Sequence, residues 1–391
     1  MDAGALRILV LTSTLPARPG DGTPEFVLTL SLKMADSAVV KILAPRVKLG
    51  VARVDAVEIR RFPYFPRRFE SLAADAILPE LRRRPWKIFE AVSLLMSFVL
   101  HTIRFCRELR PDVIHAHWLI PGGLSAWLAS IVTRTPYIVT VHGADAYALT
   151  GPVAKWLRRR VIGRAHRVIP VSREIASVLG LDPRSALPMG VDLEAWDLPS
   201  GPQQRINGRF VFVGRLVEKK GLTIALRALT KVPGAHLTVV GDGPDRQMLE
   251  QLTGKLDIAS RVHFKGAQPS RLAREFLRTA NAALIPSVVA RSGDRDGTPV
   301  VLAEAVALGT PVIASRLGGI VDIVDERMAN LVAPGDPDEL AEAMRFAMDH
   351  QAVVEERAAK ARALVIDRLD ASSIAHTYIG ILEEAARGSQ L

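Results

Sequence analysis

The chain has 391 residues, 49% of them hydrophobic and 24% charged, which is typical of a folded protein too long for one hydrophobic core. A single cysteine, Cys106, excludes an intramolecular disulfide, and the sequence shows no Cys/His cluster of metal-ligand spacing, so a reducing cytosol is the expected compartment. Residues 6–12 are too few for a signal peptide, and no apolar run reaches the roughly 18 residues of a spanning helix. We therefore expect two domains and no membrane span.

Positive charge is concentrated in the first half of the chain. Residues 1–198 contain 27 Lys/Arg and 18 Asp/Glu, a net charge of +9, whereas residues 199–391 contain 24 and 23, a net charge of +1. The densest part is 60–86, where seven arginines alternate with aromatic residues. Such an excess predicts an anionic partner, either nucleic acid or an anionic membrane surface. Because no nucleic-acid-binding motif carries the charge, we expect no nucleic acid and a peripheral membrane contact through 60–86. A solvated basic surface that only keeps the protein soluble is the alternative.

The first half alternates strands with helices. A strand over 6–11 is followed by a loop that contains Gly22, and then come a helix over 25–35 and a strand over 38–43. Residues 50–85 interrupt this rhythm. The helix over 87–109 has apolar residues on nearly all sides, which favours a buried crossover helix, with a membrane-lying helix as the alternative.

Two later strands of this half end in polar residues. Residues 111–118 run into His117, and residues 135–145 run into His142 and Asp145. Open α/β sheets bind their ligands beyond the carboxyl ends of strands, so the pattern predicts a binding site there. A short strand over 168–172 closes this half, and the Pro/Gly-rich residues 193–208 have the composition of a domain connection.

The second half repeats the strand–helix alternation. A strand over 209–213 leads into Gly214, Arg215, Lys220 and a helix from 222, and a strand over 237–240 leads into Gly241. Further strands are expected at 261–265, 282–285 and 311–314. Two cations five residues apart at a helix start can neutralise a diphosphate without a metal. We therefore expect no metal and no other cofactor.

The most informative stretch is 296–304. Thr298 is placed to cap a helix, Pro299 suits its first position, and Gly309 ends it, while the stripe of Val301, Ala305 and Leu308 should face the core. The helix start offers free backbone N–H groups and the positive end of the helix dipole, where a phosphate can bind. Asp296 and Glu304 can accept hydrogen bonds from sugar hydroxyls.

These motifs together resemble the retaining glycosyltransferases of family 4, which have the GT-B fold. The resemblance covers an acid followed after seven residues by Glu304, the string from Gly214 to Gly221, and the pair His142-Gly143. The sequence departs from the family pattern at Asp296 and at Met189, where the family commonly has Glu and Asn. It also lacks the common Gly-Gly pair near Gly22.

The resemblance implies the roles of individual residues. His142 would contact the donor sugar, with His142, Asp296, Arg215 and Lys220 as the catalytic group, and Asp145 and His117 would lie on the acceptor side. A UDP-, GDP- or ADP-sugar would be bound by a larger set: Gly22, Gly214, Arg215, Lys220, Gly241, Asp296, Gly297, Thr298, Pro299, Val300 and Glu304.

The implied architecture is two Rossmann-like domains that face a central cleft. They would span 1–198 on the acceptor side and 199–371 on the nucleotide-sugar side, with a final helix over 372–391 that crosses back to the first domain. The implied reaction moves a hexosyl unit to a glycan or lipid-linked acceptor, with retention of configuration, in the cytoplasm or at the inner face of its membrane. A GT-B epimerase or phosphorylase, and a catalytically weak sugar-nucleotide-binding protein, remain as alternatives.

Overall fold

The computed structural model describes residues 4–18, 23, 25–74, 77, 80–81, 84–147, 151–193 and 204–388. The chain divides into two compact units: unit 1 is Met1–Val171, Ser185–Leu187 and Ala371–Leu391, and unit 2 is Ser172–Arg184 and Pro188–Asp370. This division differs from the expected boundary at 198, because residues 172–184 and the residues from 188 to 370 belong to unit 2. The C-terminal helix belongs to unit 1.

Unit 1 is built on a seven-stranded sheet in the order β3-β4-β2-β1-β5-β6-β7. All neighbours are parallel except the short pair of β3 and β4. The central strands are buried almost throughout, as expected where helices cover both faces of a parallel sheet. The strands are β1 (Arg7–Leu11), β2 (Val39–Pro45), β3 (Arg53–Val54), β4 (Val57–Phe62), β5 (Val113–His117), β6 (Tyr137–Val141) and β7 (Arg167–Pro170).

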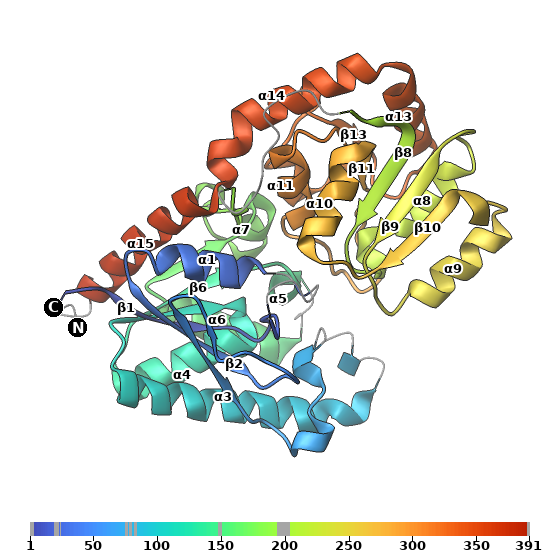
Figure 1. Cartoon of the computed structure of the whole chain (residues 1–391). Coiled ribbons are helices and arrows are strands. Elements are labelled where there is room, and N and C mark those ends of the chain that lie inside the picture. Colours follow the sequence, from blue (N-terminus) through green and yellow to red (C-terminus); the bar gives the residue numbers. More distant parts are fainter. Residues whose placement is uncertain are drawn as a thin grey trace. The chain divides into compact units, whose positions relative to one another are not determined.

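Helices lie on both faces of this sheet (Figure 1). On one face, α15 (Ala371–Gly388) packs against α1 (Phe26–Met34) and against β5. On the other face, α4 (Leu124–Thr133) packs between α3 (Ile88–Leu109) and α6 (Pro152–Arg164). The return of the C-terminal helix to the first unit is the GT-B connectivity.

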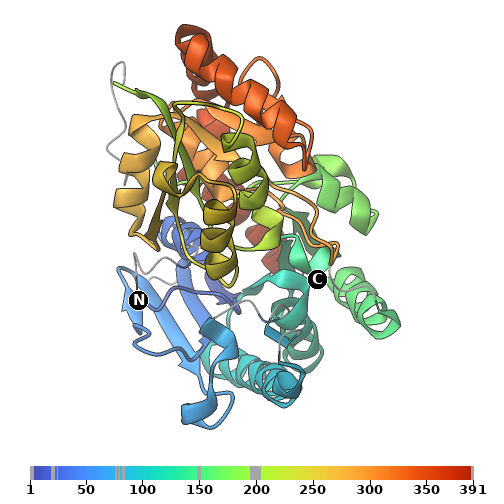
Figure 2. The same ribbon diagram turned by 90° about the vertical axis from the view of Figure 1, so that its right-hand side faces the viewer.

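Unit 2 has a six-stranded parallel sheet in the order β10-β9-β8-β11-β12-β13, with helices on both sides (Figure 2). The strands are β8 (Ile206–Val213), β9 (His236–Val240), β10 (Val262–Gly266), β11 (Ala280–Ile285), β12 (Val312–Ser315) and β13 (Asn330–Val332). The helices are α7 (Arg173–Leu179), α8 (Leu222–Leu229), α9 (Arg246–Lys255), α10 (Ser270–Thr279), α11 (Val300–Ala307), α12 (Gly318–Val321), α13 (Pro337–Asp349) and α14 (Gln351–Leu369).

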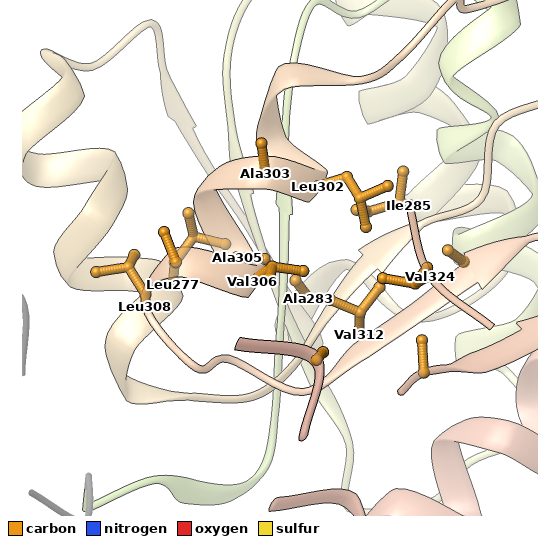
Figure 3. Packing of buried hydrophobic residues seen from close by; sticks show 14 of the residues in the cluster. Leu277, Ala283, Ile285, Leu302, Ala303, Ala305, Val306, Leu308, Val312 and Val324 are labelled. Carbon is orange, nitrogen blue, oxygen red and sulfur yellow. The ribbon is translucent and has the colours of Figure 1, made fainter. Parts of the chain in front are cut away.

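The core of unit 2 under α11 fixes the carboxyl ends of β11 and β12, next to the expected site. Leu302 and Val306 of α11 lie in one cluster with Ala283, Ile285 and Val312 of the sheet (Figure 3). Burying a side chain such as Leu302 stabilises the fold by about 1.5–3 kcal/mol. Because α11 is buried on most sides, more fully than one stripe predicts, its first turn is held firmly against β11 and β12.

The interval 50–85, expected to break the alternation, adds a strand to the sheet. In β4, buried positions such as Val57 and Ile59 alternate with partly exposed Glu58 and Arg60, and Glu58 pairs with Lys41 of β2. The pattern of period two was obscured by the basic and aromatic composition. β3, which precedes β4 in the chain, pairs with it antiparallel at the edge of the sheet.

Candidate functional site

The candidate donor site lies within unit 2, beyond the carboxyl ends of its parallel strands. Four of these strands end at one edge, and each leads into a residue of the expected site or its neighbour: Gly214 after β8, Gly241 after β9, Ser287 after β11 and Ser315 at the end of β12. Parallel strands place these ends side by side, which is where such sheets bind ligands.

An ion pair joins two residues that the sequence analysis placed at this site. Lys220 Nζ lies 2.9 Å from Asp296 Oδ2, and the Ser287 hydroxyl donates to the same oxygen at 3.0 Å. Lys219 Nζ lies 3.2 Å from Asp294 Oδ2 and 3.8 Å from Asp296 Oδ1. Two lysines and two aspartates therefore alternate in one cluster, whose charges balance in the absence of a ligand.

The carboxyl group of Asp296 stays ionised in this setting. Its side chain is 10% exposed, and burial acts to raise its pKa. The charges of Lys220 and Lys219 and the hydrogen bonds from Lys220 and Ser287 outweigh burial, so the pKa is lowered overall. An ionised carboxylate accepts hydrogen bonds, and the ammonium of Lys220 has three N–H donors, so neither group is exhausted by the pair.

The helix after Asp296 begins one residue later than predicted. Pro299 has ψ 123° and stands at the N-cap, and Val300 is the first helical residue. Within the described part of the chain, the amides of Gly297, Val300 and Val301 have no intramolecular acceptor. These N–H groups lie at the positive end of the helix dipole, which suits a phosphate group.

Glu304 lies one turn along α11, on the side of the helix that is not fully buried. It is partly exposed, as is Val300, whereas Leu302, Ala303 and Ala305 are buried. The spacing of four residues between Val300 and Glu304 places them on the same face. Glu304 therefore lies on the partly exposed side of α11, where its expected role would place it.

Glycines at this edge allow backbone segments to approach closely. A Cβ on Gly241 would lie 1.9 Å from the carbonyl oxygen of Gly214, and one on Gly319 would lie 1.2 Å from that of Gly297. The amides of Gly214 and Gly241 donate to Val240 and Gly266 at 2.9 and 2.8 Å. Gly214 and Gly241 therefore shape the turns, and their own N–H groups are not offered to a ligand.

Unit 1 brings three histidines together at the ends of β5 and β6. His117 Nδ1 lies 2.9 Å from His142 Nε2, and the ring of His115 contacts that of His117 with centroids 4.3 Å apart. His115 Nε2 lies 2.8 Å from Thr140 Oγ1, which lies 3.1 Å from the hydroxyl of Tyr378 on α15. A chain of polar groups thus runs between α15 and the strand ends.

The three histidines are neutral. Burial lowers the pKa of His115 and of His142 to about 3 and that of His117 well below its ordinary value, with smaller contributions from the neighbouring histidines to His142 and His117. A neutral imidazole has one N–H donor and one acceptor nitrogen.

The hydrogen-bond network assigns the tautomers. His117 Nε2 is buried without a partner, and an unpaired buried N–H is rarer than an unpaired acceptor. The proton of His117 therefore lies on Nδ1 and is donated to His142 Nε2. His142 then carries its proton on Nδ1, for which the described residues provide no acceptor. His142 thus offers one N–H donor to a ligand oxygen.

Asp145 lies in the interior of unit 1. Its two carboxylate oxygens accept from the amides of Leu119 at 2.7 Å and Gly143 at 3.1 Å, which ties together the turns after β5 and β6. Burial raises the pKa of Asp145 and outweighs the hydrogen bonds from these N–H groups, which lower it. An acceptor-side role for Asp145 is therefore indirect, through the backbone it holds.

The remaining predicted residues divide into two cases. Arg215 is partly buried directly after β8, where the prediction placed it, and Gly22 lies outside the described residues. In the part of the chain that the structure describes, no group of three or more His, Cys, Asp or Glu side chains could hold a metal ion.

Sequence reasoning assigned no role to several residues of these two clusters. They are Lys219, Asp294 and Ser287 in unit 2, and His115, Thr140 and Tyr378 in unit 1. The i, i+2 pair of Asp294 and Asp296 and the doublet of Lys219 and Lys220 were visible signals. Tyr378 had none, because 238 residues separate it from its partner Thr140.

Two family models match the chain, one on each unit. The model of glycosyl transferases group 1 matches residues 204–363, and that of the glycosyl transferase 4-like domain matches residues 22–184. The chain is 32% identical over 268 residues to the putative teichuronic acid biosynthesis glycosyltransferase TuaC of Bacillus subtilis (strain 168), of which it spans 64%, the match covering 64% of this chain. It is 30% identical over 290 residues to the phosphatidyl-myo-inositol mannosyltransferase of Mycobacterium leprae (strain TN), covering 70% of this chain and 74% of that one.

Solved structures agree on the fold. Sucrose-phosphate synthase from Thermosynechococcus elongatus superposes with a TM-score of 0.77 at 18% identity, covering 98% of this chain and 100% of that one. Anabaena Alr3699/HepE in complex with UDP-glucose superposes with a TM-score of 0.74 at 18% identity, covering 96% and 99%. The expected fold class, two Rossmann-like domains with a returning C-terminal helix, is confirmed. The chain belongs to the glycosyl transferases group 1, the GT-B enzymes of the family 4 kind.

Proposed function

We propose that this protein is a retaining glycosyltransferase that moves a hexosyl unit from a nucleoside diphosphate sugar to a glycan or lipid-linked acceptor. The observation that carries the proposal is the pairing of Lys220 with Asp296 beside the open amides at the start of α11. A cation and N–H donors that suit a diphosphate lie next to an ionised carboxylate that suits sugar hydroxyls, and this supports the proposal. Relatives named for polysaccharide and glycolipid synthesis, and neighbours bound to UDP and UDP-glucose, support this substrate class.

The chemical barrier is departure of the nucleoside diphosphate from an oxocarbenium-like centre. Lys220, Arg215 and the amides of Val300 and Val301 stabilise the negative charge that develops on the leaving phosphate. Fixed cations supply this stabilisation, so the proposed reaction requires no metal ion. The leaving phosphate itself takes the proton of the acceptor hydroxyl. Its departure and the attack then occur on the same face of the sugar, which retains the configuration.

The sugar and the ribose are held by different groups. Asp296 accepts from hydroxyls of the transferred sugar, and Glu304, a turn and more along α11, accepts from the ribose. His142 donates its Nδ1–H to a sugar oxygen. Because this imidazole is neutral, it provides a hydrogen bond and no net charge.

The acceptor class follows from the charge of the first half and from the family. A net charge of +9 over 1–198 suits an acceptor presented at an anionic membrane, and the proposed location is the cytoplasm, peripheral to that membrane. No role is proposed for nucleic acid.

A thermal-shift panel of UDP-, GDP- and ADP-sugars tests the donor assignment, because a ligand that binds only the folded state raises its melting temperature. We expect one nucleotide to raise Tm in the presence of EDTA and Lys220→Ala to reduce that shift, with Lys219→Ala as the matched control. No shift with any nucleotide sugar would contradict the proposal. Product analysis by NMR then separates a transferase, which needs a second acceptor, from a GT-B epimerase or phosphorylase.

A further inference from the structure

One helix layer of unit 1 exposes apolar and basic side chains together. It consists of α3, α4 and α6, which lie on the face of the sheet opposite α1 and α15 (Figures 1 and 2). We refer to the outward side of these three helices as the α3–α4–α6 face. Contiguous apolar surface that is exposed to solvent, with polar residues at its rim, marks an interaction site in a folded protein.

The outer side of α3 is an uninterrupted apolar stripe. Phe89, Val92, Met96 and Leu100 are 74%, 54%, 57% and 61% exposed. Their spacing of three or four residues aligns them along one side of the helix. No Asp, Glu, Lys or Arg occurs between Glu90 and Arg104, so the stripe carries none of these charged side chains.

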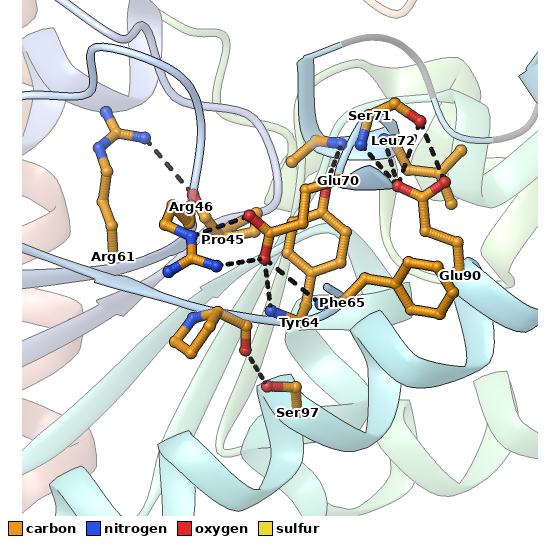
Figure 4. A network of polar contacts seen from close by, with 12 residues as sticks. Pro45, Arg46, Arg61, Tyr64, Phe65, Glu70, Ser71, Leu72, Glu90 and Ser97 are labelled. Atoms are coloured by element: carbon orange, nitrogen blue, oxygen red, sulfur yellow. Dashed lines mark hydrogen bonds and ion pairs between the residues drawn. The ribbon is translucent and has the colours of Figure 1, made fainter. Parts of the chain in front are cut away.

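The inner side of α3 is fixed to unit 1. Leu94 and Phe98 are buried in the core, and the carboxylate of Glu90 accepts from the amides of Ser71 and Leu72 at 2.6 and 2.9 Å (Figure 4). Ser97 donates to the carbonyl oxygen of Pro63 at 2.6 Å. Core packing and these hydrogen bonds therefore fix α3 to unit 1 along the segment from Glu90 to Phe98.

This arrangement corrects the expectation that no segment is long and apolar enough to span a membrane. The helical stretch Pro85–Leu109 passes that test by length and composition, with 28% of its most apolar window buried. Spanning would remove Leu94 and Phe98 from the core and break the bonds of Glu90. A helix with one side anchored and the other apolar instead suits the plane of a bilayer interface.

The charge on the α4–α6 part of this face is of one sign. From Trp118 to Arg164 the only acidic residue is Asp145, which is buried. The α6 helix carries five cations, Lys155, Arg158, Arg159, Arg160 and Arg164. Arg160 lies over the ring of the exposed Trp156 at 5.3 Å, which places an aromatic ring among the cations at the level where headgroups would lie.

The segment 60–86 contributes less than its composition suggests. Arg60 pairs with Glu58 and with Glu108, and Arg61 donates to backbone carbonyl oxygens, among them that of Val51. Arg67, Arg68 and Arg84 are exposed, and Arg82 and Arg83 lie outside the described residues. Among the described residues of α4 and α6, the positive charge of the α3–α4–α6 face lies mainly on α6.

We propose that the α3–α4–α6 face docks onto an anionic lipid bilayer. The stripe of α3 inserts at headgroup level, and the cations of α6 contact anionic headgroups. Charge favours this occupant over a second copy of the chain, because two copies joined through this face would bring two sets of α6 cations together. This docking surface rests on the peripheral membrane location proposed above, and it is independent of the donor assignment.

Sedimentation with vesicles tests the proposal on the full chain. We expect binding to vesicles of phosphatidylcholine with 30% phosphatidylglycerol, a loss of at least tenfold in affinity for Met96→Glu/Leu100→Glu, and a similar loss for Arg159→Ser/Arg160→Ser. The matched control is Met248→Glu/Leu364→Glu, which adds the same charges at exposed apolar positions of unit 2 and should bind as the wild type does. Circular dichroism and the nucleotide thermal shift check that each variant is folded.

The outcomes separate the alternatives. Failure of the wild type to bind anionic vesicles at low salt overturns the proposal, and so does equal binding by the Met96/Leu100 variant. If the wild type binds pure phosphatidylcholine vesicles as well as it binds anionic ones, and salt does not weaken this binding, the proposed role of the α6 cations is wrong. Analytical ultracentrifugation shows whether the chain self-associates, and a dimer that Met96→Glu/Leu100→Glu dissociates, without vesicle binding, would assign the face to a second copy.

Discussion

The Nδ1 atom of His117 lies 2.9 Å from the Nε2 atom of His142. Both imidazoles are neutral, so this bond decides which nitrogen of His142 carries the proton. The role that we propose for His117 is therefore that of a positioning residue, which acts on the donor sugar through His142.

The relationship predicts different outcomes for two substitutions of His117. His117→Asn keeps an N–H donor near the position of Nδ1 and should stay within a few-fold of wild-type turnover. His117→Phe keeps a ring but removes the donor, so it should lose about tenfold in kcat, equivalent to one hydrogen bond of about 1.4 kcal/mol. Steady-state kinetics and nitrogen NMR of the His142 ring provide the measurement. Equal activity of the two variants would show that the tautomer assignment is wrong.

The buried histidines predict a stability that falls with acid. An unfolded histidine titrates near pH 6.5, whereas the pKa of folded His115 is about 3. Between these values the unfolded chain binds a proton that the folded chain excludes, so unfolding becomes more favourable as pH falls. From pH 7 to pH 5 the free energy of unfolding should drop by about 2 kcal/mol for His115 alone.

His115→Gln isolates this contribution. Glutamine can keep the bond to Thr140 but does not titrate, so urea unfolding should show a pH-dependent loss about 2 kcal/mol smaller in the variant. His376→Gln, at an exposed position of α15 in the same unit, is the control and should leave the pH dependence as it is. A parallel pH dependence of wild type and His115→Gln would refute the neutral-histidine account.

Lys220 and Arg215 should both be needed for turnover. Removing either side chain, as in Lys220→Ala or Arg215→Ala, should cost roughly 2–4 kcal/mol of transition-state stabilisation, or about thirtyfold to a thousandfold in kcat. Lys219→Ala should cost less, because Lys219 pairs chiefly with Asp294. Added magnesium should not rescue either variant. Near-normal turnover of both Lys220→Ala and Arg215→Ala would argue against the diphosphate assignment.

Substitutions of Asp296 and Glu304 should affect different steps. Asp296→Asn removes the ionised acceptor next to Lys220 and should reduce kcat more than it weakens nucleotide binding. Glu304→Gln should chiefly weaken binding of the product nucleoside diphosphate, because its partner is the ribose. Calorimetric titration of the product nucleotide alongside kinetics distinguishes them. The same loss of nucleotide affinity in both variants would mean that the assigned roles are wrong.

Much of the fold is predictable because glycines mark the ends of many helices and strands, and apolar runs mark the buried strands. The strand that became β9 is a short apolar run closed by Gly241, and the helix after Asp296 ends at Gly309, which has φ 63°. β4 was missed because arginines and aromatics mask its alternation. The exposed side of α3 was not predictable either, since a helix that is apolar nearly all round does not reveal which side the core covers.

The site was predictable as a set of residues more than as a set of contacts. Lys220 and Asp296 are 76 positions apart, and only the register of β8 beside β11 brings their loops together. The contact of His117 with His142 follows from the neighbouring strands β5 and β6, so pairing those strand ends would have found it. The burial of Asp145 depends on the turn after β5, which no local pattern predicts.

Hydrogen–deuterium exchange with and without the nucleotide sugar that raises Tm most tests the central claim directly, because it locates the donor on the chain. The account predicts that the sugar protects peptides covering 214–221 and 287–304 of unit 2, leaves 246–266 unchanged, and protects far less in Lys220→Ala than in Lys219→Ala. Protection confined to other parts of the chain, or protection at 214–221 and 287–304 that Lys220→Ala leaves intact, would contradict the assignment of the donor site to Lys220 and Asp296.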